Sequence, residues 1–269
     1  MAKKTNITVH MMVKNEDQWV RYSLLSVLPY VDRILVTDTG SSDHTLEAIK
    51  SIASPKIKLT ETRVNTPEGV TLIREEQLKN TKTDWFWVVD GDEIYPEETA
   101  HEVVQATKGS YEGVVVRRYD LLGDIYHRQA ESVGGYQLFG YKGHLVTRII
   151  NQSKIKGLHY SGTYPNEGFY DGTNISTRDR NSKNWYITKG YLFHAMYMKR
   201  SSLGSNLAMF NRNKYKVELG ISLKVQLPAV FYDYPPLAWE PDPLSKRSLG
   251  YEALATIITP LKNLKRKFL

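Results

Sequence analysis

The chain has 269 residues, of which 41% are apolar and 11% aromatic, enough for one substantial hydrophobic core. It contains no cysteine, which excludes disulfide bridges and thiolate metal sites. Its 36 Lys and Arg residues against 29 Asp and Glu residues give a net charge of +7, which suits an anionic substrate, nucleic acid or a membrane surface and selects none of them. The first residues lack the apolar segment of a signal peptide, and no apolar run is long enough to span a bilayer. We therefore expect a cytosolic chain, either free in solution or bound to a membrane surface.

Strand and helix patterns alternate over roughly the first 100 residues. The expected strands are 7–13, 33–37, 56–63 and 84–89, and the expected helices are 20–31, 46–52 and 68–80. Asp17 precedes the first of these helices and is its expected N-cap. Because such alternation is typical of parallel strands joined by helical crossovers, it predicts an α/β fold with a mostly parallel central sheet flanked by helices.

The fourth expected strand is an unbroken apolar and aromatic run that ends in Asp90-Gly91-Asp92-Glu93. A run that is apolar on both faces is typical of a strand in the middle of a sheet. Two carboxylates this close repel each other unless a cation or a hydrogen-bonding ligand lies between them. Gly91 lets the backbone approach a ligand. The pattern favours a divalent cation that carries a diphosphate, and the alternative is an acidic turn after a core strand.

After Pro96 the pattern is less regular. Strands are expected at 111–119 and 145–150, a long loop or lid at 120–143, and a loop-like segment at 158–184. An apolar and aromatic segment, 185–198, contains His194.

The last part of the chain changes character. A helix is expected at 203–219, and residues 254–269 combine an apolar stripe with Lys and Arg. Such a segment fits either a helix at a membrane surface or a helix docked on the body of the protein, and Pro260 is expected to interrupt it in both cases. We predict two parts, a catalytic and nucleotide-binding domain at 1–200 and a helical extension at 201–269 that is a candidate for membrane or partner contact.

Polar groups follow three of the expected strands, and parallel strands place such ends at one edge of a sheet. They are Lys14-Asn15-Glu16, Asp38-Thr39-Gly40-Ser41-Ser42-Asp43 and Asp90-Gly91-Asp92-Glu93. Together they resemble the motifs of the family 2 glycosyltransferases, which have the GT-A fold, a Rossmann-like nucleotide-sugar-binding architecture. The resemblance is close for residues 5–100 and weaker up to about 200. The less regular region after residue 120 would then hold the acceptor site and a lid.

The resemblance implies a role for each matching residue. Asn15, Glu16 and Asp38 would contact the base and ribose of the donor, and Arg74 would reach its diphosphate. Asp90 and Gly91 would lie against the nucleotide-sugar. Asp90, Asp92 and His194 would hold Mn²⁺ or Mg²⁺, and the alternative for His194 is a buried core histidine among aromatic residues.

The resemblance also implies a reaction. A metal-dependent, inverting enzyme would move a sugar from a nucleotide-diphosphate donor, expected to be a UDP-sugar, to a glycan, a lipid-linked acceptor or a protein. A carboxylate must take the proton of the acceptor hydroxyl. Glu167 is the candidate base, with Glu93, Asp124 and Glu131 as rivals.

Other functions fit parts of the pattern. A phosphatase of the haloacid-dehalogenase type also uses Asp-x-Asp after a strand, but its motif lies near the start of the domain. A nucleotidyltransferase shares the metal and diphosphate chemistry. A non-catalytic module that binds a nucleotide, a membrane or nucleic acid would fit the positive charge, but converging carboxylates would repel phosphate without a metal. We therefore expect no nucleic-acid partner, a cytoplasmic location at the inner face of the membrane as one hypothesis, and peripheral membrane contact through the basic C-terminus as another.

Overall fold

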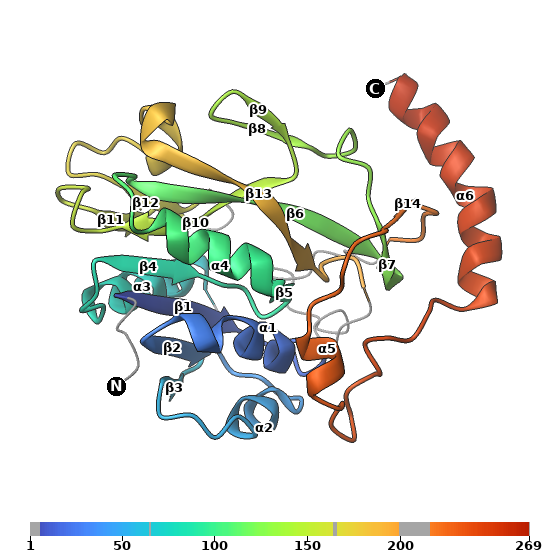
Figure 1. The fold of residues 1–269 in the computed structure, drawn as a ribbon, viewed down its shortest axis with the longest axis horizontal. Coiled ribbons are helices and arrows are strands. Elements are labelled where there is room, and N and C mark those ends of the chain that lie inside the picture. The colour runs from blue at the N-terminus through green and yellow to red at the C-terminus, as the bar shows by residue number, and fades with distance from the viewer. Residues whose placement is uncertain (1–5, 65, 164–165, 199–215, 269) are drawn as a thin grey trace.

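The computed structural model describes residues 6–64, 66–163, 166–198 and 216–268 (Figure 1). Ten of the described strands form one sheet, whose main path runs β14-β7-β6-β10-β4-β1-β2-β3. Strand β13 pairs with β6 and β5 beside this path. The chain is therefore an α/β protein with one large central sheet, as its sequence predicts.

The N-terminal half of the sheet is parallel. It consists of β1 (Ile7–Val13), β2 (Arg33–Asp38), β3 (Ile57–Glu61) and β4 (Trp85–Val88). β1 lies between β2 and β4 and runs parallel to both, so the C-terminal ends of the three strands meet at one edge. All four expected strands are confirmed.

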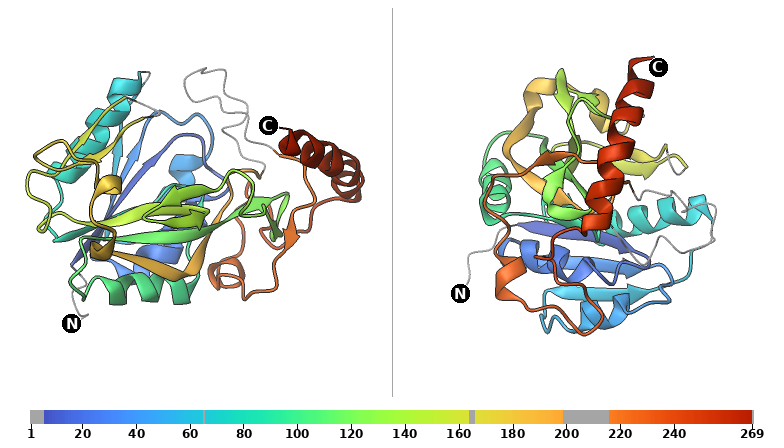
Figure 2. Two further views of the ribbon diagram at one scale, coloured as in Figure 1. Left: turned by 90° about the horizontal axis from the view of Figure 1, so that it is seen from above. Right: turned by 90° about the vertical axis from the view of Figure 1, so that its right-hand side faces the viewer.

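Helices cover both faces of this half. They are α1 (Val20–Val27), α2 (Thr45–Lys50), α3 (Pro67–Lys79) and α4 (Glu97–Ala106). Figure 2 shows α3 and α4 on opposite faces of the sheet. The predicted cap of α1 is wrong, because its N-cap residue is Trp19 and not Asp17. The carbonyl of Glu16 accepts from the amides of both Trp19 and Val20, so a turn precedes the helix and Asp17 lies within it.

The second half of the sheet is mixed. β10 (Leu145–Asn151) runs antiparallel to β4 and to β6 (Gly113–Leu122), and β13 (Trp185–His194) runs parallel to β6. The short strand β5 (Glu93–Ile94) pairs with the end of β13. The predicted loop at 120–143 is partly wrong. It contains the end of β6 and three strands, β7 (Asp124–Arg128), β8 (Tyr136–Leu138) and β9 (Tyr141–Gly143).

Short elements also interrupt the segment 158–184. β11 (His159–Ser161) and β12 (Gly168–Tyr170) form a separate antiparallel pair. Two single turns of 3-10 helix, η2 (Thr177–Asp179) and η3 (Ser182–Asn184), also lie in this segment. A third, η1 (Leu28–Tyr30), directly follows α1. Strands of three residues are too short to give a clear alternation in the sequence, so the segment was predicted as loop.

The C-terminal region contains β14 (Ile221–Ser222), α5 (Val230–Asp233) and α6 (Leu249–Lys267). Of the helix expected at 203–219, residues 203–215 lie outside the described part, and residues 216–219 are not helical. Pro260 lies inside α6, so the prediction that it interrupts the helix is wrong. Thr256, four residues earlier, is exposed, and water can therefore hydrate the carbonyl that Pro260 leaves without an N–H partner.

The main core lies between the sheet and the helices α1 and α4. Its fully buried side chains include Val9, Met11, Leu24, Trp87 and Val103. This packing holds the parallel strands rigidly, and with them the strand ends where the sequence places the polar motifs.

Candidate active site

The loops after β1 and β2 are bound to each other through Asn15. Its backbone has φ 54°, in the left-handed region that asparagine tolerates better than most residues. The side-chain Oδ1 accepts a hydrogen bond from the amide of Ser42 at 2.8 Å, and the Asn15 amide donates to Oγ of Ser41 at 2.9 Å. Asn15 therefore joins two of the three predicted strand ends.

Asp38 organises the second strand end from within. One of its carboxylate oxygens accepts from the amides of Gly40 and Ser41, both at 2.9 Å. The other accepts from the Ser41 hydroxyl at 2.5 Å. The side chain is buried, and these bonds fix the turn that the sequence assigned to base or ribose binding.

The third strand end passes close to the first at Gly91. A Cβ atom at this position would lie 3.0 Å from Cγ1 of Val13 and 3.3 Å from Cβ of Glu16. A side chain at this position would require Val13 or Glu16 to move by a few tenths of an ångström, so glycine permits the closest approach. The close approach places Glu16 beside the acidic motif, so the structure brings all three predicted motifs together.

Asp90 is held by two arginines. Its Oδ1 lies 3.3 Å from Nη2 of Arg74, and its Oδ2 lies 2.5 Å from Nη2 of Arg148, which also binds the fully buried Glu93. Burial opposes the ionisation of Asp90, but the charges of Arg148 and Arg74 outweigh it and lower the pKa of the carboxyl. Asp90 is therefore ionised at neutral pH and remains partly exposed.

Asp92 faces His194. The Nε2 atom of His194 lies 3.5 Å from Oδ2 of Asp92. Two contacts between the main chains bring them together, the pairing of His194 with Glu93 and the bond from the Ala195 amide to the Asp92 carbonyl at 2.9 Å. Both side chains are largely buried. A residue late in the chain thus completes the motif after β4.

Asp120 fixes the orientation of His194. Its Oδ1 lies 2.9 Å from Nδ1 of His194, and Arg118 Nε and His144 Nδ1 lie 3.0 and 3.4 Å from the same carboxylate. Burial would lower the pKa of His194, but Asp92 and Asp120 outweigh it and raise it to about 9. A histidine that binds a metal commonly donates its other ring N–H to a carboxylate in this manner.

The pair of Asp92 and His194 fits a divalent cation. It offers one carboxylate oxygen and, once a cation displaces the Nε2 proton, one imidazole nitrogen to the same space, and the Nδ1 side of the imidazole is already engaged. Among the described residues, no group of three His, Asp or Glu side chains is arranged to hold a metal. Mg²⁺ in phosphate-transfer sites usually takes only one or two protein carboxylates, and substrate phosphates supply the other ligands.

Glu167 directly precedes β12, which pairs with β11. β11 packs on α3, where the Tyr160 amide donates to Glu75 at 2.8 Å and the Thr71 hydroxyl donates to the Gly162 carbonyl at 2.7 Å. Burial raises the pKa of Tyr160 to about 12, and the charges of Arg74, Glu167 and Asp90 also act on it. Oε2 of Glu167 is buried and has no hydrogen-bond partner among the described residues. A buried carboxylate oxygen normally has a hydrogen-bond partner, so this one is an exception in the described residues.

The three rival bases have other partners. Glu93 is bound by Arg148. Asp124 lies 2.7 Å from Nδ1 of His127 and accepts from the Arg247 amide at 3.2 Å. Glu131 accepts from the Tyr191 hydroxyl at 3.3 Å.

The motifs of the sequence do not identify Arg148 and Asp120 as site residues. Arg148 lies on β10 among aliphatic residues, and Asp120 lies near the end of β6. A charged residue inside an apolar strand indicates a buried ion pair, because a buried charge requires a partner. The partner cannot be identified from the sequence, since it comes from a different strand.

The family model described as "Glycosyl transferase family 2" matches residues 8–203 of this chain. No curated protein matches the chain closely enough to be counted as a relative.

Three solved structures illustrate what the fold is similar to. TarS of S. aureus, residues 1–349 in complex with UDP-GlcNAc, has 13% identity and a TM-score of 0.47, over 77% of this chain and 61% of TarS. Glucosyl-3-phosphoglycerate synthase of Mycobacterium tuberculosis, with Mn²⁺, UDP and glucosyl-3-phosphoglycerate, has 17% identity and a TM-score of 0.46, over 70% and 71%. The mannosyltransferase PcManGT of Pyrobaculum calidifontis, with GDP-Man and Mn²⁺, has 14% identity and a TM-score of 0.44, over 72% and 58%. The classification rests on the family model, which matches more than half of the chain.

Proposed function

The chain belongs to glycosyl transferase family 2, and from this premise we propose that it transfers a sugar from a nucleoside-diphosphate donor to an acceptor hydroxyl. The observation that supports this most directly is the convergence of Asp92 and His194 beside the ends of β1, β2 and β4. A UDP-sugar is the first donor to test. The acceptor is a glycan, a lipid-linked sugar or a protein.

We infer that Asp92 and His194 hold a divalent cation, Mn²⁺ or Mg²⁺, together with the donor. Such a cation neutralises the charge that develops on the departing diphosphate. Asp120 keeps Nδ1 of His194 occupied, so that Nε2 is directed toward Asp92. Asp90 contributes negative charge beside this pair, and Arg74 and Arg148 hold it in place.

In this proposal the nucleoside binds at the ends of β1 and β2. The bonds that Asn15 and Asp38 make with the Ser41–Ser42 turn fix the shape of that surface. Glu16, beside Gly91, connects it to the acidic motif. The roles of Asn15 and Asp38 are then to preorganise the nucleotide site as well as to contact the ligand.

Glu167 is the proposed general base. Its buried, unpartnered oxygen can accept the proton of an acceptor hydroxyl as the new glycosidic bond forms at the anomeric carbon. Attack on the face opposite the departing diphosphate would invert that carbon. We propose the cytoplasm as the location of the reaction.

The test is thermal stabilisation by a panel of nucleoside diphosphates, each with and without Mn²⁺. A ligand that binds only the folded chain raises the melting temperature, and about 100-fold excess over Kd adds about 2.7 kcal/mol. We expect one base to give a shift that requires the metal. A shift that is independent of metal, or no shift with any nucleotide, would contradict the proposal.

A nucleotidyltransferase would share the binding result but not the reaction. It would release pyrophosphate from a nucleoside triphosphate, whereas the proposed enzyme releases a nucleoside diphosphate from a sugar donor. Analysis of the released product by chromatography therefore separates the two. Metal-dependent binding without turnover of any donor would instead indicate a binding module.

A further inference from the structure

Helix α6 lies at one end of the molecule, beside β7 and β14 (Figures 1 and 2). Polar contacts attach it to the segment 216–222. Glu218 accepts from Arg266 at 2.7 and 2.9 Å and from Lys262 at 3.3 Å. The Thr259 hydroxyl accepts from the Leu219 amide at 2.9 Å. The docked face of the helix therefore includes three of its hydrophilic residues.

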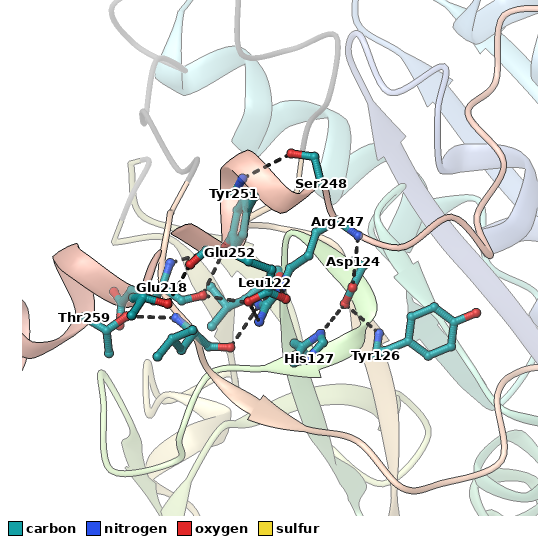
Figure 3. Close-up of polar contacts among 12 residues, drawn as sticks. Leu122, Asp124, Tyr126, His127, Glu218, Arg247, Ser248, Tyr251, Glu252 and Thr259 are labelled. Carbon is teal, nitrogen blue, oxygen red and sulfur yellow. Dashed lines mark hydrogen bonds and ion pairs between the residues drawn. The ribbon is translucent and has the colours of Figure 1, made fainter. Parts of the chain in front are cut away.

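The start of α6 is fixed in the same way (Figure 3). Arg247, just before the helix, donates to Glu252 at 2.7 Å and to the carbonyls of Leu122 and Leu219 at 3.2 and 2.9 Å. The Tyr251 hydroxyl donates to the Lys216 carbonyl at 2.9 Å. In the described part of α6, only Tyr251 and Ala255 are buried. The contacts thus determine which face of the helix is directed to the solvent.

That outer face is apolar. Leu254, Ile257, Leu261, Leu264 and Phe268 are exposed, with Ile257 at 65% and Phe268 at 81%. Their spacing of three and four residues places them along one stripe of the helix. A helix of a soluble domain normally turns such a stripe inward, and α6 turns it outward.

The charges beside the stripe are positive. Lys265 and Lys267 are exposed in the last turn, next to Lys262 and Arg266 at the docked edge. Glu252 is the acidic residue of this helix, and Arg247 binds it. No helix of the described residues is long and apolar enough to cross a membrane.

We propose that the outer face of α6 binds the surface of a bilayer that contains anionic lipids. The apolar stripe would enter the interface between headgroups and acyl chains, and the lysines would meet the lipid phosphates. Basic residues near such a surface add electrostatic attraction to the binding. Charge favours this occupant over a second copy of the chain, because the helix has no unengaged acidic residue to offer to the lysines of a copy. The inference does not depend on the transfer reaction.

The test is co-sedimentation of the full chain with vesicles of phosphatidylcholine, alone or mixed with phosphatidylglycerol. We expect binding to the mixed vesicles that weakens with added salt. The double variant Ile257→Ser/Leu261→Ser should bind at least tenfold more weakly, since both side chains would leave the lipid. Leu72→Ser is the matched control, because Leu72 is an exposed apolar residue on α3. This variant should bind the mixed vesicles as tightly as the wild type.

A second variant tests the charges. Lys265→Glu/Lys267→Glu keeps the stripe and should lose the preference for phosphatidylglycerol. All substituted residues are exposed, so unchanged melting temperatures are expected and show that the fold is retained. Equal binding of wild type and both double variants would overturn the proposal. Absence of vesicle binding would also overturn it. If the chain is then a dimer that the Ile257→Ser/Leu261→Ser change dissociates, the stripe binds a second copy of the chain.

Discussion

The Nε2 atom of His194 lies 3.5 Å from Oδ2 of Asp92, and its Nδ1 atom lies 2.9 Å from Oδ1 of Asp120. Three strand ends contribute to this line of side chains, because Asp92 follows β4, Asp120 lies on β6 and His194 ends β13. The relationship explains how a short acidic motif can acquire a nitrogen donor from a distant segment. It also allows the proposed ligands, Asp92 and His194, and the residue that orients His194, Asp120, to be tested by separate substitutions.

Asp92→Ala should abolish the metal-dependent part of donor binding. The variant removes the carboxylate that faces His194, so the cation would lose one of its two protein ligands. With UDP and Mn²⁺ well above Kd, we expect the wild-type melting temperature to rise by roughly 5–10 °C and that of the variant to stay unchanged. Asp84→Ala is the control, since Asp84 lies outside the site, where it binds Asn6 and Ser153. A full Mn²⁺-dependent shift in Asp92→Ala would exclude Asp92 as a ligand.

Asp120→Asn should weaken the metal without removing a ligand. The amide keeps the shape of the side chain but loses the charge that orients and polarises His194. We expect metal affinity to fall by about 10- to 100-fold, with nucleotide affinity at saturating metal close to that of the wild type. Titration of Mn²⁺ at fixed UDP, followed by calorimetry, separates the two constants. An equal loss of Mn²⁺ affinity and UDP affinity would indicate that the substitution damages the site as a whole.

Arg148→Met should destabilise the fold strongly. The guanidinium neutralises the fully buried Glu93 and also binds Asp90, so its removal leaves a buried carboxylate without its partner. We expect a loss of about 3–5 kcal/mol in the free energy of unfolding, measured by urea denaturation. Lys50→Met is the comparison, because Lys50 and Glu61 form an exposed ion pair worth at most about 1 kcal/mol. Similar losses in the two variants would contradict the assigned role of Arg148.

Much of the fold and part of the site could be predicted from local patterns. The strands β1 to β4 are apolar runs followed directly by polar motifs, and a parallel sheet brings such ends together without further information. Arg148, Asp120 and the strands β7 to β9 were not predicted. The positions of Arg148 and Asp120 depend on pairing of β6 with the distant strands β10 and β13, which hydrophobic periodicity does not encode. The strands β7 to β9 form local hairpins of three to five residues, which are too short to show a clear alternation. The helix that continues through Pro260 is not predicted, since the sequence does not show that Thr256, whose carbonyl loses its N–H partner, is exposed.

His10 should make the chain sensitive to mild acid. It is fully buried, it stacks on Phe86 at 4.7 Å between ring centroids, and its Nε2 lies 2.6 Å from the Thr81 hydroxyl. Burial and, to a smaller extent, the charge of Arg74 lower its pKa from 6.5 to about 3. The unfolded chain therefore binds a proton at His10 more readily than the folded chain does. The contribution of neutral His10 to the free energy of unfolding is complete above pH 6.5 and is lost as the pH falls toward 3.

The matching variant is His10→Gln, which cannot titrate. Its free energy of unfolding should be lower than that of the wild type at pH 7.5, since the stacking is lost, but should depend less on pH. Between pH 7.5 and pH 5 the wild type should lose about 2 kcal/mol more than the variant. Urea denaturation at the two pH values measures the difference. Parallel pH profiles of the two proteins would show that His10 titrates normally in the folded state.

Glu167→Gln should remove catalysis and leave donor binding intact. The buried Oε2 of Glu167 has no hydrogen-bond partner among the described residues. The charges of Glu167, Arg74 and Asp90 all affect the pKa of Tyr160. An acceptor hydroxyl in this space would give its proton to the carboxylate, which an amide cannot replace. Since water can substitute for an acceptor, slow hydrolysis of the sugar donor provides the assay. We expect the rate to fall by about 10²- to 10⁴-fold and the Mn²⁺-dependent shift with UDP to persist. Glu131→Gln and Asp124→Asn are the paired controls, because both carboxylates bind partners elsewhere in the structure. A large loss in either control, with Glu167→Gln fully active, would transfer the role of base to that residue.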